Sequence, residues 1–115
     1  FHIMCVSLEY KKELMERLAK IPGVYPISTA SHNIEIADAY WSKRDALEWL
    51  CEQTGFLVEQ VIAIGDSEND YEGICWAGTG VAMENASDRV RKAAGFVTRS
   101  NEQDGVFWAL KELLK

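Results

Sequence analysis

The sequence has 115 residues, of which 48% are hydrophobic, so it can form one ordinary domain, or a small core with an appendage, around a buried interior. Acidic residues outnumber basic residues by 18 to 12, and this excess argues against a general nucleic-acid or anionic-membrane surface, because both require a positive face. Three widely spaced cysteines fit neither a disulfide framework nor paired zinc ligands, and no apolar run approaches the roughly 18 residues that span a bilayer, so we expect a cytoplasmic protein.

Residues 1–40 predict a small α+β piece. Residues 1–6 read as a strand that is already under way at the first residue, so we expect further residues before it. Residues 8–19 predict an amphipathic helix whose polar side includes Lys11. The apolar face of that helix is expected to consist of Leu8, Met15, Leu18 and Ala19. Residues 24–29 and 33–37 predict a hairpin.

Residues 41–115 change to helices that alternate with short apolar strands, a rhythm that predicts a parallel sheet with helices on both faces. The helix over 42–54 opens with a capping-box pattern, with Ser42 at its N-cap and Asp45 three residues on. The later elements are expected as strands over 61–64, 80–83 and 96–98 and as helices up to 77, over 87–94 and over 104–114. The last helix is expected to bury Val106, Phe107, Leu110, Leu113 and Leu114.

The loop that follows the strand over 61–64 reads Gly65-Asp-Ser-Glu-Asn-Asp70. Ligands bind beyond the carboxyl ends of strands in open α/β sheets, so its position nominates it as a site. Asp66 and Asp70 are four residues apart at a helix start, and two carboxylates with an amide between them suit Mg²⁺. The same residues also fit a polar turn that caps the next helix. A calcium loop of the EF-hand type fits less well, because its sixth position is Tyr71 rather than Gly.

Lys43 lies in the first turn of the helix over 42–54. Free N–H groups at a helix N-terminus favour anions, and a lysine there adds a full positive charge for a phosphoryl group. The alternative is an ordinary solvated lysine beside Arg44, which is what most lysines are.

Three features occur in a fixed order: the Ser-Lys pair at 42–43, the Gly-Asp-x-x-Asn-Asp loop, and the stretch Gly80-Val-Ala-Met-x-Asn-Ala86. In this combination the chain resembles the haloacid dehalogenase superfamily, specifically its Cof-type sugar-phosphatase-like branch, from about Ile34 to the C-terminus. The resemblance implies part of a Rossmannoid core, preceded by the last part of a cap domain. It also implies a Mg²⁺-dependent phosphatase that hydrolyses a small phosphorylated metabolite, such as a sugar phosphate, through an aspartyl-phosphate.

By that resemblance Lys43 holds the substrate phosphoryl group, and Asp66 is a Mg²⁺ ligand. Asn69 contacts the phosphoryl group or the substrate, and Asp70 supports the metal shell through water or a hydrogen bond. The family's first motif, Asp-x-Asp, has no counterpart, because no two aspartates in this sequence are two residues apart. We therefore expect the chain to lack the nucleophile and to be inactive alone.

Two other functions compete with this interpretation. The protein is a non-catalytic binding or assembly module in one of them, and surface left uncovered by the missing part of the core would then favour self-association. The other is the phosphorylation domain of a P-type ATPase, which shares a similar loop but does not fit the Ser-Lys spacing.

Cys75 and Trp76 are interpreted as core packing. Asn85 and Asn101 are interpreted as turn residues in loops that could border the site.

Overall fold

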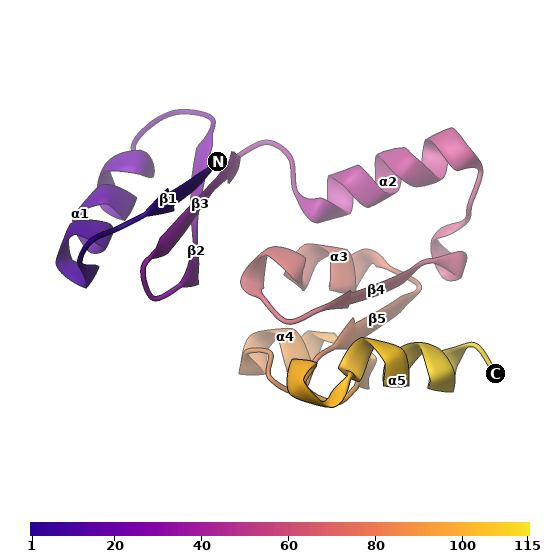
Figure 1. The fold of residues 1–115 in the computed structure, drawn as a ribbon. Helices are drawn as coiled ribbons and strands as arrows, with labels where there is room; N and C mark the ends of the chain where they lie inside the picture. The colour runs from indigo at the N-terminus through magenta and orange to yellow at the C-terminus, as the bar shows by residue number, and fades with distance from the viewer. The chain divides into compact units, whose positions relative to one another are not determined.

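A computed structural model describes residues 1–115, the side chain of Thr29 excepted. The chain forms two compact units, Phe1–Ser42 and Lys43–Lys115 (Figure 1). The division predicted from the sequence lies slightly earlier in the chain, after residue 40. Over the described residues, no helix has both the length and the hydropathy that crossing a membrane requires.

The first unit is one helix and a three-stranded antiparallel sheet in the order β1-β3-β2. Its elements are β1 (His2–Met4), α1 (Leu8–Leu18), β2 (Val24–Ala30) and β3 (Asn33–Asp38). The predicted hairpin is confirmed as β2 and β3, in which Tyr25 pairs with Ala37 and Ser28 with Ile34. Ile34 is fully buried and forms the centre of this small core.

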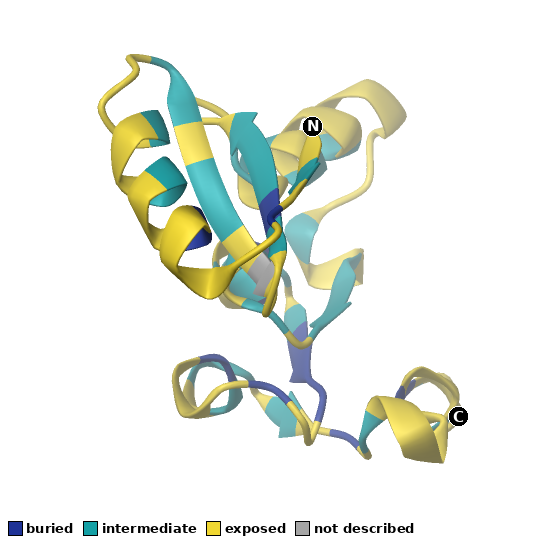
Figure 2. Cartoon of the chain, turned by 60° about the vertical axis from the view of Figure 1, so that its left-hand side comes forward, coloured by how far each residue is buried: buried dark blue, intermediate teal, exposed yellow. Residues whose placement is uncertain are grey.

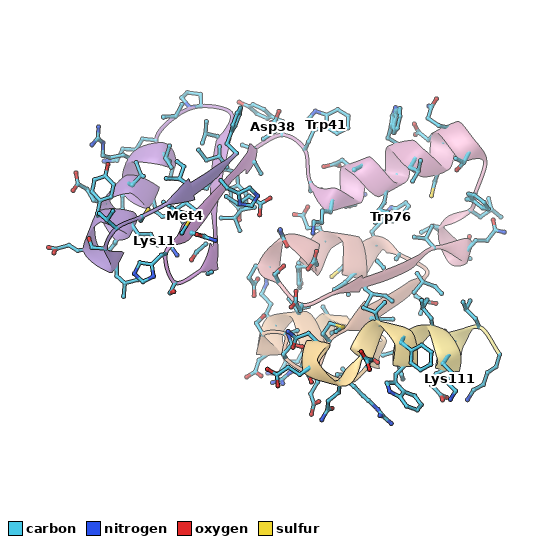
Figure 3. The ribbon with its side chains drawn as sticks, in the orientation of Figure 1. Met4, Lys11, Asp38, Trp41, Trp76 and Lys111 are labelled. Atoms are coloured by element: carbon cyan, nitrogen blue, oxygen red, sulfur yellow. The ribbon has the colours of Figure 1, made fainter. Side chains whose placement is uncertain are left out.

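The predicted helix is confirmed as α1, but its buried face differs from the expected one. Lys11, expected on the polar side, is buried, whereas Leu8 is 59% exposed. The Lys11 ammonium donates to the Ser28 hydroxyl at 2.6 Å and to the Ala30 carbonyl at 2.5 Å, and it also contacts the Ser31 carbonyl at 3.3 Å (Figure 3). Because oxygens from the hairpin satisfy its charge, Lys11 joins α1 to β2 instead of facing water.

The second unit contains a parallel sheet in the order β4-β5-β6, so the predicted mixed α/β fold with a parallel sheet is confirmed. Its helices are α2 (Lys43–Thr54), α3 (Tyr71–Trp76), α4 (Asp88–Ala93) and α5 (Gly105–Leu113). Its strands are β4 (Ile62–Gly65), β5 (Thr79–Ala82) and β6 (Phe96–Val97), and short 3-10 turns η1, η2 and η3 cover Val58–Gln60, Glu68–Asp70 and Asn101–Gln103.

The core of this unit lies where α3 and α4 pack against β5, and Figure 2 shows how short the fully buried stretches are. Its buried residues are Ile74, Ala82, Ala86 and Val90. Gly80 permits the close approach, since a Cβ there would meet the Ile74 carbonyl oxygen and would lie 2.9 Å from Ile74 Cγ2. The packing fixes α3, and with it the loop that leads into α3 from β4.

Two predictions about buried side chains in this unit are wrong. Helix α5 buries Gly105 and Ala109, whereas Val106, Phe107, Leu110 and Leu114 are all at least 38% exposed and Leu113 is half-buried. Position 105 of the packing face requires a glycine, because a Cβ there would meet the backbone carbonyl oxygen of Arg99. Cys75 is exposed rather than packed in the core, because α3 turns Gly73 and Ile74 inward.

Candidate active site

The loop between β4 and α3 is organised around the carboxylate of Asp70. One oxygen of this carboxylate accepts the backbone N–H groups of Asp66 and Ser67, both at 3.1 Å, and the Ser67 hydroxyl at 2.8 Å. Gly65 makes room for it, since a Cβ on Gly65 would lie 2.5 Å from Asp70 Cγ. The aspartate therefore folds the loop back onto itself and points the backbone of residues 66 and 67 inward.

The second oxygen of Asp70 accepts a hydrogen bond from the ammonium of Lys43, the first residue of α2. Helix α2 packs closely against α3: a Cβ on Gly73 of α3 would lie 3.4 Å from Leu47 Cδ1 of α2. The Asp70 side chain is 14% exposed and that of Lys43 is 56% exposed, so the ion pair is covered on the aspartate side and open on the lysine side. The ammonium is thus anchored and still faces solvent.

Burial raises the pKa of Asp70, but the hydrogen bonds from Lys43 and Ser67 outweigh it and hold that pKa below its usual value. A carboxylate with a depressed pKa stabilises the fold above the pKa of the unfolded chain, about 3.9, and the stabilisation is lost as the pH falls through the folded value.

We expect Asp70→Asn to lower the free energy of unfolding at pH 7 by about 1–3 kcal/mol, because it removes a charged acceptor from several donors. The difference in the free energy of unfolding between this variant and the parent chain should become smaller as the pH is lowered below about 4. Urea denaturation at pH 7 and at pH 3 measures both effects. Asp88→Asn is the control, since Asp88 pairs with Arg91 on an exposed helix surface. A gap that stays constant with pH would contradict the assigned role of Asp70.

Asp66 is exposed, and its Oδ2 accepts a hydrogen bond from Asn85 Nδ2 at 3.0 Å. The Asn85 carbonyl oxygen accepts the backbone N–H of Asn101 at 2.9 Å. The sequence predicts both asparagines only as turn residues. Asn85 could have been recognised from its place in the loop after β5, because the carboxyl ends of neighbouring parallel strands meet at one edge of the sheet.

Asn69 is half-buried, and its Oδ1 lies 2.5 Å from the Ser67 hydroxyl, which shares its single hydrogen between Asn69 and Asp70. This bond uses the carbonyl oxygen and leaves the two amide hydrogens as donors. Across the described chain, the amide nitrogen of Asn69 donates no hydrogen bond, so it can serve a ligand.

Glu68 fastens the loop to α4. Its carboxylate accepts the Ser87 hydroxyl at 2.6 Å and the Arg89 guanidinium at 2.5 Å, and that guanidinium lies 3.8 Å from the Tyr71 ring centre. The hydrogen bond from Ser87, followed by that from Arg89, lowers the pKa of Glu68. The loop is therefore held by α2 through Asp70 and by α4 through Glu68.

The structure thus brings the predicted residues Lys43, Asp66, Asn69 and Asp70 together at the carboxyl end of β4. As a cation ligand Asp66 fits, because hard cations favour carboxylate oxygen and its Oδ1 accepts no hydrogen bond from any residue that the structure describes. Asp70 is held differently, because one of its oxygens accepts three hydrogen bonds and the other accepts one from the Lys43 ammonium. Within the described chain, no three His, Cys, Asp or Glu side chains gather closely enough to hold a metal ion.

A hollow of about 620 Å³ lies elsewhere, beside β6 and α5. Its lining includes Arg99, whose guanidinium lies 3.7 Å from the Trp108 ring centre, and it includes none of the four predicted site residues. This hollow is therefore separate from the four predicted site residues.

Both the sequence and the fold of the chain are similar to those of known proteins. Residues 2–110 match the family described as haloacid dehalogenase-like hydrolase. A 5-amino-6-(5-phospho-D-ribitylamino)uracil phosphatase of Bacillus subtilis is 38% identical over 103 residues, covering 90% of this chain and 41% of the relative. A phosphoglycolate phosphatase of Methanobrevibacter smithii is 34% identical over 106 residues, covering 90% of this chain and 45% of the relative.

Among solved structures, a haloacid dehalogenase-like hydrolase from Bacteroides thetaiotaomicron superimposes with a TM-score of 0.84 at 32% identity. The match covers 97% of this chain and 42% of that protein. The chain spans less than half the length of these two curated relatives.

Proposed function

This chain belongs to the haloacid dehalogenase-like hydrolases, and from that membership we propose that the protein containing it is a Mg²⁺-dependent phosphatase. Its substrate is a small phosphorylated metabolite, such as a sugar phosphate, and the reaction passes through an aspartyl-phosphate. The observation that carries the proposal is the Lys43 ammonium, which is anchored on Asp70, the same carboxylate that accepts the backbone N–H of Asp66. At this edge of the sheet the Lys43 ammonium can bind a phosphoryl group, and the Asp66 carboxylate can bind the cation that accompanies it.

Asp66 is the residue of this chain that would hold Mg²⁺. The ion, when bound, neutralises charge on the phosphoryl oxygens. Asp70 acts indirectly, since it places both the Lys43 ammonium and the backbone of residues 66 and 67. The resemblance implies that Asp70 supports the metal shell through water or a hydrogen bond. We propose the second of these, support through hydrogen bonds.

Lys43 and Asn69 bind the phosphoryl group. The reaction spreads negative charge over the phosphoryl oxygens, so a fixed ammonium and a fixed amide donor stabilise the transition state more than a mobile pair would. The hydrogen bonds from Lys43 to Asp70 and from Ser67 to Asn69 provide that fixation.

The attacking carboxylate belongs to the part of the relatives that this chain does not cover. The aspartates of this sequence stand at positions 38, 45, 66, 70, 88 and 104, and no two have the Asp-x-Asp spacing. The first unit, with its helix and antiparallel sheet, is proposed as part of a cap domain, which would contribute to substrate choice.

Phosphate release from an aryl phosphate tests the proposal. We expect the whole protein to turn over with Mg²⁺, to fall to background with excess EDTA and to recover when Mg²⁺ is restored. The 115-residue chain alone should release no phosphate. Turnover by this chain would show that its nucleophile lies within it. A whole protein that binds Mg²⁺ but hydrolyses no phosphate monoester would be a non-catalytic binding module instead.

A further inference from the structure

Asn85 connects the loops that follow all three strands of the parallel sheet. It lies after β5, its amide nitrogen donates to Asp66 after β4 at 3.0 Å, and its carbonyl oxygen accepts the N–H of Asn101 after β6 at 2.9 Å. The side-chain amide of Asn85 therefore connects Asp66, the proposed metal ligand, to the loop that follows β6.

The hydrogen bonds determine which way this amide points. The backbone N–H of Asn101 can only donate, so it requires the carbonyl oxygen of Asn85, and the NH₂ group is left to face Asp66. The flipped amide would place its oxygen against a carboxylate and its NH₂ against an N–H group. Both contacts would be repulsive, so the Asn101 N–H selects the orientation that serves Asp66.

The backbone around Asn85 is held on both sides. The Met83 N–H donates to the Gly65 carbonyl at 2.9 Å, and the Ala86 N–H donates to the Met83 carbonyl at 3.0 Å. Ala86 is only 6% exposed, which anchors the loop in the core directly beyond Asn85. The Asn85 side chain thus starts from a fixed point.

Asp66 depends on this amide more than Asp70 depends on any single partner. Asp70 accepts from Lys43, from Ser67 and from the Asp66 backbone, whereas the Asp66 carboxylate receives from the described residues only the Asn85 hydrogen bond. An exposed carboxylate without that restraint would sample several rotamers, and binding a cation would then carry the cost of ordering it.

We propose that Asn85, oriented by the Asn101 N–H, is a positioning residue that fixes the Asp66 carboxylate for Mg²⁺. The inference rests on the proposed function and extends it to a residue in the loop after β5. It makes the backbone N–H of Asn101, which bonds to Asn85 and not to Asp66, a determinant of metal affinity.

The test removes that one N–H. Asn101→Pro deletes the donor at the first residue of η3, where proline is accepted, and the extended Ser100 (φ -68, ψ 167) suits the residue before a proline. Asn101→Ala keeps the N–H and is the matched control. We expect Asn101→Pro to weaken Mg²⁺ binding by the whole protein about threefold to tenfold, measured by isothermal titration calorimetry, and Asn101→Ala to leave it unchanged.

Phosphatase rates across a range of Mg²⁺ concentrations give a second readout. Saturating Mg²⁺ should restore the kcat of Asn101→Pro, which would not happen if the substitution merely damaged the fold. Asn85→Leu, similar in size and unable to hydrogen-bond, should weaken Mg²⁺ binding at least as much, and it decides the question if Asn101→Pro does not fold.

Unchanged Mg²⁺ affinity in the folded variants, or a lost rate that Mg²⁺ does not restore, would overturn the positioning role and leave the phosphatase proposal standing. A parent protein without Mg²⁺-dependent phosphatase activity would overturn both.

Discussion

Asp66→Asn should lower the kcat of the whole protein by about 10²-fold or more, because the charge that would hold Mg²⁺ disappears while the shape of the side chain is kept. The Asn85 amide can still donate to the new carbonyl oxygen, so the fold should tolerate the change. Steady-state phosphate release at saturating Mg²⁺ measures the effect, with thermal unfolding as the check on folding.

Glu84→Gln is the control for Asp66, since Glu84 is an exposed acid in the neighbouring loop, and it should leave kcat within about twofold of the parent. A fully active Asp66→Asn variant would remove Asp66 from the site. Equal losses in both variants would point to a general effect of negative charge at this edge of the sheet.

Lys43→Met should reduce kcat/KM by about 10²-fold to 10³-fold, the range found when one donor to a developing negative charge is removed. The loss of stability should be small, below about 1 kcal/mol, because the lysine side of the ion pair is open to solvent. Lys43→Arg should recover part of the activity, since it keeps the charge but changes the donor geometry.

Arg44→Met is the matched control for Lys43, because Arg44 is the adjacent residue and pairs with Glu48 on the exposed side of α2. We expect it to retain nearly full activity. A Lys43→Met variant with normal kcat/KM and reduced stability would show that Lys43 only supports the fold of the loop.

The site residues could be predicted because the determining signals are local in the sequence. A strand that ends in Gly-Asp-x-x-Asn-Asp places Asp66 and Asp70 on one loop whatever the rest of the chain does. Lys43 could be placed because α2 begins directly after Ser42. Its meeting with Asp70, 27 residues away, depends on the packing of α2 against α3, which the resemblance implied and which periodicity alone does not give.

The features that were missed depend on groups brought together by the fold. Lys11 looks like a surface residue in the sequence, but its acceptors are supplied by residues 28, 30 and 31. The role of Asn85 follows from the strand order β4-β5-β6, which sets its loop between those of Asp66 and Asn101. Hydrophobic spacing could not determine either arrangement.

Helix α5 illustrates a limit of apolar pattern as a guide to burial. Its large residues suggested the buried face, yet the helix packs through Gly105 and Ala109 and exposes Phe107 by 59%. At position 105 a close approach to the backbone of Arg99 requires a residue without a Cβ, and apolar spacing does not reveal such a requirement. The self-association expected from exposed apolar surface stays a prediction.

Replacing Mg²⁺ with Mn²⁺ in crystals of the whole protein, and locating the ion by its anomalous scattering, tests the central claim most directly. We predict a peak within coordination distance of the Asp66 carboxylate, with Asp70 still hydrogen-bonded to Lys43. An ion bound away from Asp66, or a lysine turned away from that carboxylate toward another face, would contradict the assignment of this loop as the metal and phosphate half of an active site.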